Sequence, residues 1–242
     1  MGRQHTLPFP YYGGKYNHLD WLLPQLPADG PYVEPFGGSA VVLINREPTR
    51  VETYNGILGD VANFFVILRD DQDRLLAKLK YTPYSREMYR RSTELYHGET
   101  AYSAVDRALY ILVNLCQGRD GIMSVSELNW AYDRTNSRRG RGAKVSAWEY
   151  RQTQLKDVAE RLSRVQIEYF DYSEILDCYD YEDALFYCDP PYPPGVHNGF
   201  DQSKFEMSDD DHRELAEHLD AAEGRVAFSG YNCDLMDELY GE

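Results

Sequence analysis

Residues 187–195 read YCDPPYPPG, and this stretch determines how the chain around it must fold. The apolar run before the prolines, ALFYC at 184–188, is typical of a buried strand. Two consecutive prolines cannot continue a sheet, because neither has a backbone N–H to donate. The strand therefore ends and the chain turns, which leaves Asp189 and Tyr192 at its carboxyl end. Open α/β sheets bind their ligands at that end.

A second candidate site lies in VEPFGGSA at 33–40. We predict a strand that ends near Glu34, a turn at Gly37 and Gly38, and a helix from about Ser39. Glycines allow a ligand to approach the backbone, but the G-x-G-x-x-G fingerprint of dinucleotide sites is absent. The negative charge of Glu34 disfavours phosphate and suits a ligand with an ammonium group, such as an amino acid. A strand, turn and helix without any ligand remain an alternative.

A third candidate lies near the N-terminus, where residues 10–16 read PYYGGKY. Lys15 could meet a carboxylate, and Tyr11 or Tyr12 could stack on a flat ring. Taken alone, the segment is also compatible with an ordinary turn that carries an exposed lysine.

The rest of the chain alternates between strand and helix patterns. Strands are predicted within 49–54, 165–170 and 225–231, and helices within 59–80, 106–116, 147–165 and 208–222. Asp60 is the expected N-cap of the helix over 59–80. This rhythm predicts an α/β fold, and it is interrupted at about 83–147 by a region with a long polar stretch rich in glycine, serine and arginine.

The charge of the chain is strongly acidic but unevenly distributed. The 242 residues carry a net charge of −15, with 19 arginines, 6 lysines and 40 acidic residues. That balance alone argues against a nucleic-acid partner, and it is typical of proteins from salt-loving organisms or high-GC genomes. The segment 134–144 nevertheless has five positive residues and no negative one. They are Arg134, Arg138, Arg139, Arg141 and Lys144.

Cysteine and hydropathy patterns exclude several classes of protein. The four cysteines are far apart, without a C-x-x-C pair, which argues against a zinc ribbon or a disulfide scaffold. No apolar stretch approaches the ~18 residues of a membrane span, and the first residues lack the apolar core of a signal peptide. We therefore expect no metal, no membrane association and a cytoplasmic location, and the acid-rich, lysine-poor composition is compatible with a high-salt cytoplasm.

The acid and proline after the strand suit chemistry on an exocyclic nucleobase amine. Such an amine is a poor nucleophile, because its lone pair is delocalised into the ring. If the Asp189 carboxylate and the Pro190 carbonyl each accept one N–H, the lone pair is localised and aimed at an electrophile. Tyr192 could stack on the base, and its face tolerates a sulfonium cation. The alternatives are a plain Pro-Pro turn and a polyproline ligand for a partner domain.

In this order, YYGGK, VEPFGGSA and DPPY resemble the cofactor and catalytic motifs of the Dam-like, alpha-class DNA adenine methyltransferases. Stretches between them, including 51–70 and 160–171, resemble a phage and prokaryotic branch of that family. The resemblance implies a Rossmann-like S-adenosyl-L-methionine-dependent methyltransferase core with an inserted, mainly helical target-recognition domain. The core would comprise residues 1–82, the cofactor-binding part, and 148–242, the catalytic part, with the insert at 83–147. Membership of a restriction–modification system and a lone phage modifier are both compatible with it.

The resemblance also implies roles for individual residues. Cofactor contacts are expected from Tyr11, Lys15, Glu34, Phe36, Gly37, Gly38, Asp171 and Asp189. Asp189, Pro190 and Tyr192 would hold an adenine flipped out of double-stranded DNA. The five basic residues of 134–144 would hold the DNA backbone, and one or two of the arginines would read guanine. The loop 193–207 would close over the flipped base.

One position departs from the family pattern. The family usually has an acid after its second strand to bind the cofactor ribose, and the matching residue is Gly56. Glu52 or Asn55 could substitute. The departure favours, as an alternative, a catalytically weak or silent DNA-binding relative. Methylation of a cytosine amine or of adenine in RNA, and an interaction module built on the Pro-rich turn, also remain open.

Overall fold

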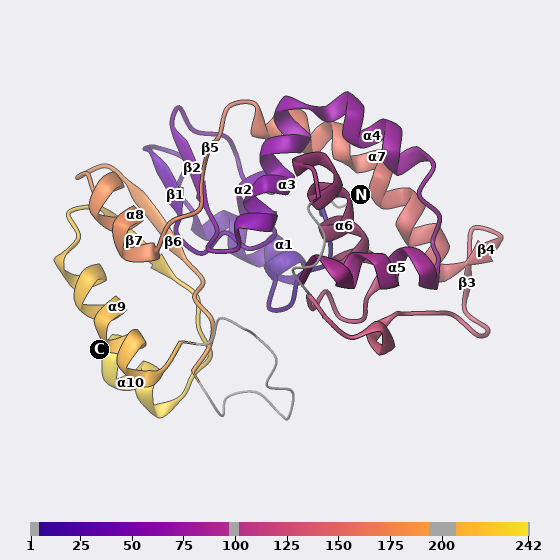
Figure 1. Cartoon of the computed structure of the whole chain (residues 1–242). Coiled ribbons are helices and arrows are strands. Elements are labelled where there is room, and N and C mark those ends of the chain that lie inside the picture. Colours follow the sequence, from indigo (N-terminus) through magenta and orange to yellow (C-terminus); the bar gives the residue numbers. More distant parts are fainter. Residues whose placement is uncertain (1–4, 97–101, 194–206, 242) are drawn as a thin grey trace.

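A parallel sheet forms the centre of the protein. A computed structural model describes residues 5–96, 102–193 and 207–241. Within them, five strands are hydrogen-bonded in the order β5-β2-β1-β6-β7, all parallel (Figure 1). The strands are β1 (Tyr32–Glu34), β2 (Glu52–Asn55), β5 (Gln166–Glu168), β6 (Leu185–Cys188) and β7 (Arg225–Phe228). The α/β fold and the strands predicted from sequence are thereby confirmed.

Both faces of the sheet are covered by helices. Tyr32 and Tyr187 pack on the side of α2 (Val41–Asn45), α3 (Gly59–Asp70) and α7 (Ala143–Leu162). Val33 and Phe186 pack on the opposite side, with α8 (Tyr172–Tyr179) and α9 (Asp209–Ala221). The strands β1, β2 and β6 are buried along their whole length. The residues of β6 are all apolar or aromatic, whereas β1 and β2 also bury the polar side chains of Glu34, Glu52, Thr53 and Asn55.

The strand order creates a switch point between β1 and β6. From β1 the chain moves outward to β2 and then to β5, whereas from β6 it moves the other way to β7. The connections that follow β1 and β6 therefore diverge at the carboxyl edge of the sheet. Ligands of doubly wound sheets bind in the crevice that this divergence opens. The VEPFGGSA and DPPY motifs both lie at this edge.

The remaining elements flank the sheet or extend from it. They are η1 (Lys15–His18), α1 (Leu19–Leu22), η2 (Leu23–Gln25), α4 (Gln72–Lys80), α5 (Arg86–Thr93), η3 (Glu94–Tyr96), α6 (Ala104–Gln117), η4 (Glu127–Asn129), β3 (Ser137–Arg138), β4 (Arg141–Gly142) and α10 (Asp234–Tyr240).

The region 83–147 shares its hydrophobic core with the rest of the protein. Apolar residues of α6, among them Leu109 and Leu112, belong to the same buried cluster as Phe64 of α3 and Leu155 of α7 (Figure 1). The polar stretch of this region ends in the β3–β4 hairpin. Helix α7 begins at Ala143, so the boundary predicted at residue 147 falls inside a helix. The division into domains stays a prediction.

Three details of the sequence interpretation were wrong or incomplete. The helix predicted over 59–80 is two helices, because Asp71 leaves helical geometry between α3 and α4. Asp60 is not an N-cap; it lies in the first turn of α3, after the capping residue Leu58, and forms an ion pair with Arg107 of α6. The short helices α8 and α10 were not predicted.

Candidate active site

Two of the three sequence motifs are joined by the side chain of Lys15. Its Nζ lies 2.6 Å from each carboxylate oxygen of Asp189 and 2.6 Å from the hydroxyl oxygen of Tyr192. Lys15 and Asp189 are 174 positions apart in the sequence, and both side chains are largely buried. The backbone carbonyl oxygen of Gly13 accepts a further hydrogen bond from the Lys15 Nζ, at 3.1 Å. The N-terminal segment therefore closes directly over the end of β6.

Opposing effects act on the Asp189 carboxyl. Burial raises its pKa, while Lys15, Tyr192 and Ser229 stabilise the ionised form. Ser229 follows β7, and its backbone N–H donates to the Cys188 carbonyl oxygen over 2.8 Å. Tyr231, two residues further on, packs edge-on against Tyr192 with ring centroids 4.6 Å apart. The sequence analysis included residues 229–231 in a predicted strand and assigned them no role in the site, because they carry no charge and no glycine pair.

At the end of β1, Glu34 is a buried carboxyl group. It is 2 % exposed, and its Oε1 accepts a hydrogen bond of 2.7 Å from the Tyr32 hydroxyl. Burial raises the pKa of Glu34 to about 8. The guanidinium of Arg46 stacks on the Tyr32 ring at 3.7 Å and counteracts that rise. A buried acid that is poised near neutrality suits a cationic ligand, which would favour its ionised form.

The Gly-Gly turn after β1 is shaped by two tyrosines. A Cβ on Gly37 would come within 2.3 Å of the Tyr54 ring, so only glycine fits there. Gly38 has a φ of 48°, in the left-handed region, and its carbonyl oxygen accepts a hydrogen bond of 2.8 Å from the Tyr54 hydroxyl. The Tyr11 ring lies against Gly38, and burial raises the pKa of Tyr11 to about 12. Tyr11 is thereby brought to the predicted cofactor turn.

Gly56 is also a steric requirement of Tyr54. A Cβ at position 56 would lie 2.5 Å from the Tyr54 hydroxyl oxygen. The residue that would carry the ribose-binding acid therefore faces the group that fixes the Gly37–Gly38 turn. The presence of glycine at position 56 is therefore linked to the presence of tyrosine at position 54.

The side chains of both proposed substitutes, Asn55 and Glu52, are bound to other groups of the protein. The Asn55 amide donates to the carbonyl oxygens of Pro35 and Phe170, at 2.9 and 3.0 Å, and accepts from the Phe170 N–H. It links the ends of β1, β2 and β5, and a cofactor contact by Asn55 stays a prediction. The idea that Glu52 could substitute is wrong. Glu52 lies at the opposite end of β2, buried and held by Arg161 at 2.6 and 2.7 Å.

Asp171 and Phe36 lie around the first turn of α8. Asp171 is the exposed N-cap of that helix and accepts hydrogen bonds from the Ser173 N–H and hydroxyl, at 3.0 and 2.7 Å. Phe36 stacks on Tyr172 with ring centroids 5.2 Å apart. The cofactor contacts predicted for these two residues stay predictions. Of the loop 193–207, residues 194–206 lie outside the described ranges.

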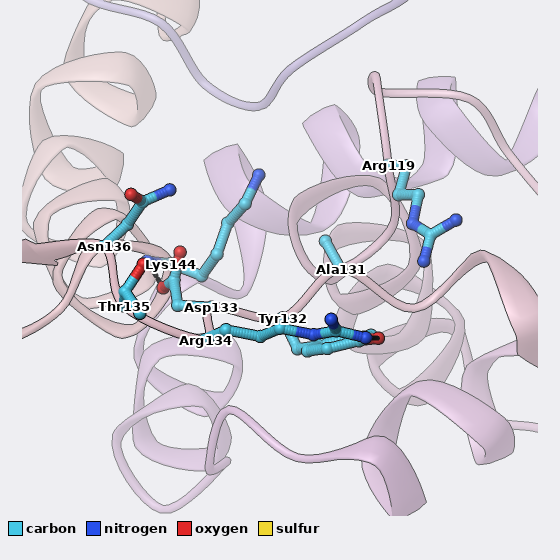
Figure 2. Close-up of a pocket in the computed structure, with 8 residues that line it drawn as sticks. All are labelled: Arg119, Ala131, Tyr132, Asp133, Arg134, Thr135, Asn136 and Lys144. Atoms are coloured by element: carbon cyan, nitrogen blue, oxygen red, sulfur yellow. Dashed lines mark hydrogen bonds between the residues drawn. The ribbon is translucent and has the colours of Figure 1, made fainter.

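The five basic residues of 134–144 do not form one patch. Arg134 and Lys144 line a surface pocket together with Arg119 and Tyr132 (Figure 2). Arg138 and Arg139 line a second hollow beside Tyr16 and Tyr150. Arg141 forms an ion pair with Glu149. Arg119 and Tyr132 were missed by the sequence analysis, although the two aromatic residues Trp130 and Tyr132 just before Arg134 were a usable signal.

With the geometry of the site established, similarity to known proteins identifies the family. Residues 11–242 match the D12 class N6 adenine-specific DNA methyltransferases. The chain belongs to this family. The match covers nearly the whole chain, including Lys15, Glu34 and Asp189, so the resemblance drawn from three short motifs is confirmed. The protein is a DNA methyltransferase directed at adenine, and such an enzyme needs a methyl donor and a DNA substrate.

Named relatives agree with the family at low identity. The Type II methyltransferase M.MjaIII of Methanocaldococcus jannaschii is 26% identical, with 94% of this chain and 85% of the relative aligned. The DNA adenine methylase of Salmonella typhi is 25% identical, with 94% and 81% aligned.

The described residues were also compared with the requirements of a metal site and of a membrane-spanning helix. Across 5–96, 102–193 and 207–241, no cluster of three or more histidine, cysteine or acidic residues suits a metal ion. No helix in those ranges has both the length and the apolar character required to cross a membrane.

Proposed function

We propose that the protein transfers the methyl group of S-adenosyl-L-methionine to the exocyclic amine of an adenine flipped out of double-stranded DNA. The observation that carries this proposal is the meeting of Lys15, Asp189 and Tyr192 at the switch point between β1 and β6. A buried carboxylate at this edge, held by a lysine from a distant segment, is suited to bind an N–H donor. The family supplies the identity of that donor.

The residues present fit one half of the cofactor well. Buried Glu34, with a pKa raised to about 8, would hold the ammonium group, and Tyr11 with Gly37 and Gly38 would form the adjoining wall. When bound, S-adenosyl-L-methionine supplies an electrophilic methyl group on a sulfonium. The fit is poorer at the ribose, because Gly56 offers no carboxylate there.

Asp189 acts on the amine by accepting a hydrogen bond from it. Its ionised carboxylate and the Pro190 carbonyl oxygen would each take one N–H, which directs the nitrogen lone pair at the methyl group. In the structure, the Lys15 ammonium occupies both carboxylate oxygens. We propose that Lys15 stands in for the target amine until the base enters, and then moves away from at least one oxygen. Burial raises the pKa of Asp189, and Lys15 opposes that rise by favouring the ionised form.

Binding of S-adenosyl-L-methionine is expected to release a proton from Glu34. Below about pH 8 the buried Glu34 carboxyl is protonated, and the ligand ammonium favours the ionised form. Affinity should therefore rise with pH between about 6 and 8, by up to about tenfold per unit. Above about pH 8 the rise should stop, because Glu34 is then already ionised in the free protein, and loss of the proton of the ligand amine should weaken binding.

Calorimetry in buffers with different heats of ionisation measures this proton release. The matched control is Glu34→Gln, which keeps the size of the side chain and should bind more weakly with no proton released. Binding without pH dependence in the wild type would show that Glu34 does not contact the ammonium. No detectable binding by the intact protein would reject the enzyme proposal in favour of a silent relative.

A weak or silent DNA-binding relative is the second candidate, and Gly56 is the observation that favours it. Because Tyr54 excludes a side chain at 56, we expect Gly56→Asp alone to destabilise the fold. Combining it with Tyr54→Phe removes the closest contact. The double variant should bind S-adenosyl-L-methionine about tenfold or more tightly than Tyr54→Phe alone, because a carboxylate would accept the ribose hydroxyls. Equal affinity of the two folded variants would show that position 56 does not face the ribose.

A further inference from the structure

Aromatic and basic side chains form a surface outside the residues that the mechanism uses. Trp130 and Tyr132 stack with ring centroids 5.7 Å apart and an interplanar angle of 21°. The Arg86 guanidinium lies 4.6 Å from the centroid of the Trp130 ring, and that of Arg134 lies 5.8 Å from the Tyr132 centroid. Arg134 also donates to the Tyr132 hydroxyl over 3.3 Å. We call Arg86, Arg119, Trp130, Tyr132, Arg134 and Lys144 the aromatic–arginine surface.

This surface is held rigidly by the backbone beneath it. The Arg119 N–H donates to the Asn129 carbonyl oxygen at 3.0 Å, and the Ala131 N–H donates to that of Gln117 at 2.9 Å. An isolated bridge between Gly118 and Trp130 completes the pairing. The end of α6 thus carries the aromatic segment as a short antiparallel pair. Arg119 and Tyr132 are exposed on it, so their side chains are available to a partner.

The same backbone is in contact with the N-terminal segment that carries Lys15. The Tyr12 N–H donates to the Gly121 carbonyl oxygen over 3.2 Å. Gly121 approaches so closely that a Cβ there would lie 2.6 Å from the backbone of Pro10 and Tyr11. Lys15 follows a few residues later and reaches Asp189. Residues 10–15 therefore link Asp189 to the backbone that carries this surface.

A pocket of about 440 Å³ is hollowed into the surface. Figure 2 shows Arg119 and Lys144 at opposite sides of it, with Tyr132 and Arg134 below them. Asp133 is the acid among the lining residues, and its carboxylate accepts a hydrogen bond of 2.6 Å from the Lys144 backbone N–H. Three cationic side chains line one hollow in a chain of net charge −15. Such local positive charge points to an anionic ligand.

We infer that this pocket binds a backbone phosphate of the substrate DNA through Arg119, Arg134 and Lys144, while the Tyr132 face contacts a base of the same strand. The inference rests on the proposed function and makes it more specific. It assigns DNA contacts to Arg119 and Tyr132, and it separates Arg134 and Lys144 from the ion-paired Arg141. Cationic side chains supply the salt-dependent part of DNA affinity, and an aromatic face supplies a salt-independent part.

The test is fluorescence anisotropy of a labelled DNA duplex without cofactor, over a series of salt concentrations. Arg119→Gln and Lys144→Gln should each weaken binding about tenfold and reduce the slope of log affinity against log salt by about 0.9. Tyr132→Leu should weaken binding by about tenfold or more with an unchanged slope. Arg74→Gln, on α4 and paired with Asp71, is the matched control and should have no effect.

Methylation and thermal unfolding separate this inference from the proposed function. Arg119→Gln and Tyr132→Leu should unfold at the wild-type temperature, and their kcat/KM for DNA should fall by the same factor as their affinity, which would support a role in binding DNA. If the wild type binds duplex DNA and both variants match it in affinity and salt slope, the inference is overturned while the methyltransferase proposal stands. If the variants bind normally but the wild type never methylates, both proposals are overturned.

Discussion

Asp189→Ala is expected to abolish most of the methyl transfer, with kcat falling by about 10³-fold or more. The carboxylate is the partner that orients the target amine, and removing one pre-positioned group of this kind typically costs about 10²- to 10³-fold. Single-turnover methylation of a DNA duplex, at saturating cofactor, measures the effect without contributions from product release. Affinity for S-adenosyl-L-methionine, measured separately, shows how far the cofactor site is altered.

Folding has to be controlled in that experiment, because Asp189→Ala leaves Lys15 without its carboxylate. The Lys15 side chain is 10% exposed, and an unpaired charge at such a site costs about 3–5 kcal/mol. The double variant Lys15→Met, Asp189→Ala removes both charges. We expect it to recover much of the stability lost by Asp189→Ala and none of the activity. Activity restored along with stability would show that Asp189 has only a structural role.

Lys15→Met alone is expected to shift the acidic limb of the pH–rate profile to higher pH. Burial raises the pKa of Asp189, and Lys15 is the main group that lowers it. Without the ammonium, Asp189 takes up a proton at a higher pH, and a protonated carboxyl is a poorer acceptor for the amine. Activity of the variant should therefore be lost at a higher pH than that of the wild type as the solution is acidified, and should recover as the pH is raised.

The measurement is kcat/KM for DNA against pH at saturating cofactor, since this parameter reports ionisations of the free enzyme. Lys15→Arg keeps the positive charge and serves as the matched control, with an acidic limb near that of the wild type. An unshifted limb in Lys15→Met, at any level of activity, would contradict the role assigned to Lys15. A uniform loss at every pH would indicate a contact with the cofactor or the DNA instead.

The parts of the site predicted from sequence are those in which one residue type has a local structural consequence. Two prolines end a strand wherever they occur, and this placed Asp189 and Tyr192 correctly at the end of β6. The Gly37–Gly38 turn followed from the same kind of local constraint. The strand β6 was recognised from its apolar run, which is buried on both faces, and β2 from residues that favour strands.

The parts that could not be predicted depend on contacts between distant residues. Glu52 and Asn55 are polar residues of one short strand, and only the fold shows that Arg161 holds the first while Phe170 holds the second. Gly56 appeared as an isolated loss until Tyr54 was seen to occupy its side-chain space. The five basic residues of 134–144 looked like one patch because sequence proximity does not show which way a hairpin turns its side chains.

Nucleoside analysis of cellular DNA tests the central claim most directly. The protein and its Asp189→Ala variant would each be expressed in cells that lack their own adenine methylation. Mass spectrometry would identify the modified nucleoside, and long-read sequencing would locate it. The account predicts N6-methyladenine at a defined sequence with the wild type and none with Asp189→Ala. Unmodified DNA from cells with folded wild-type protein, a modified cytosine, or N6-methyladenine that persists in the variant would contradict it.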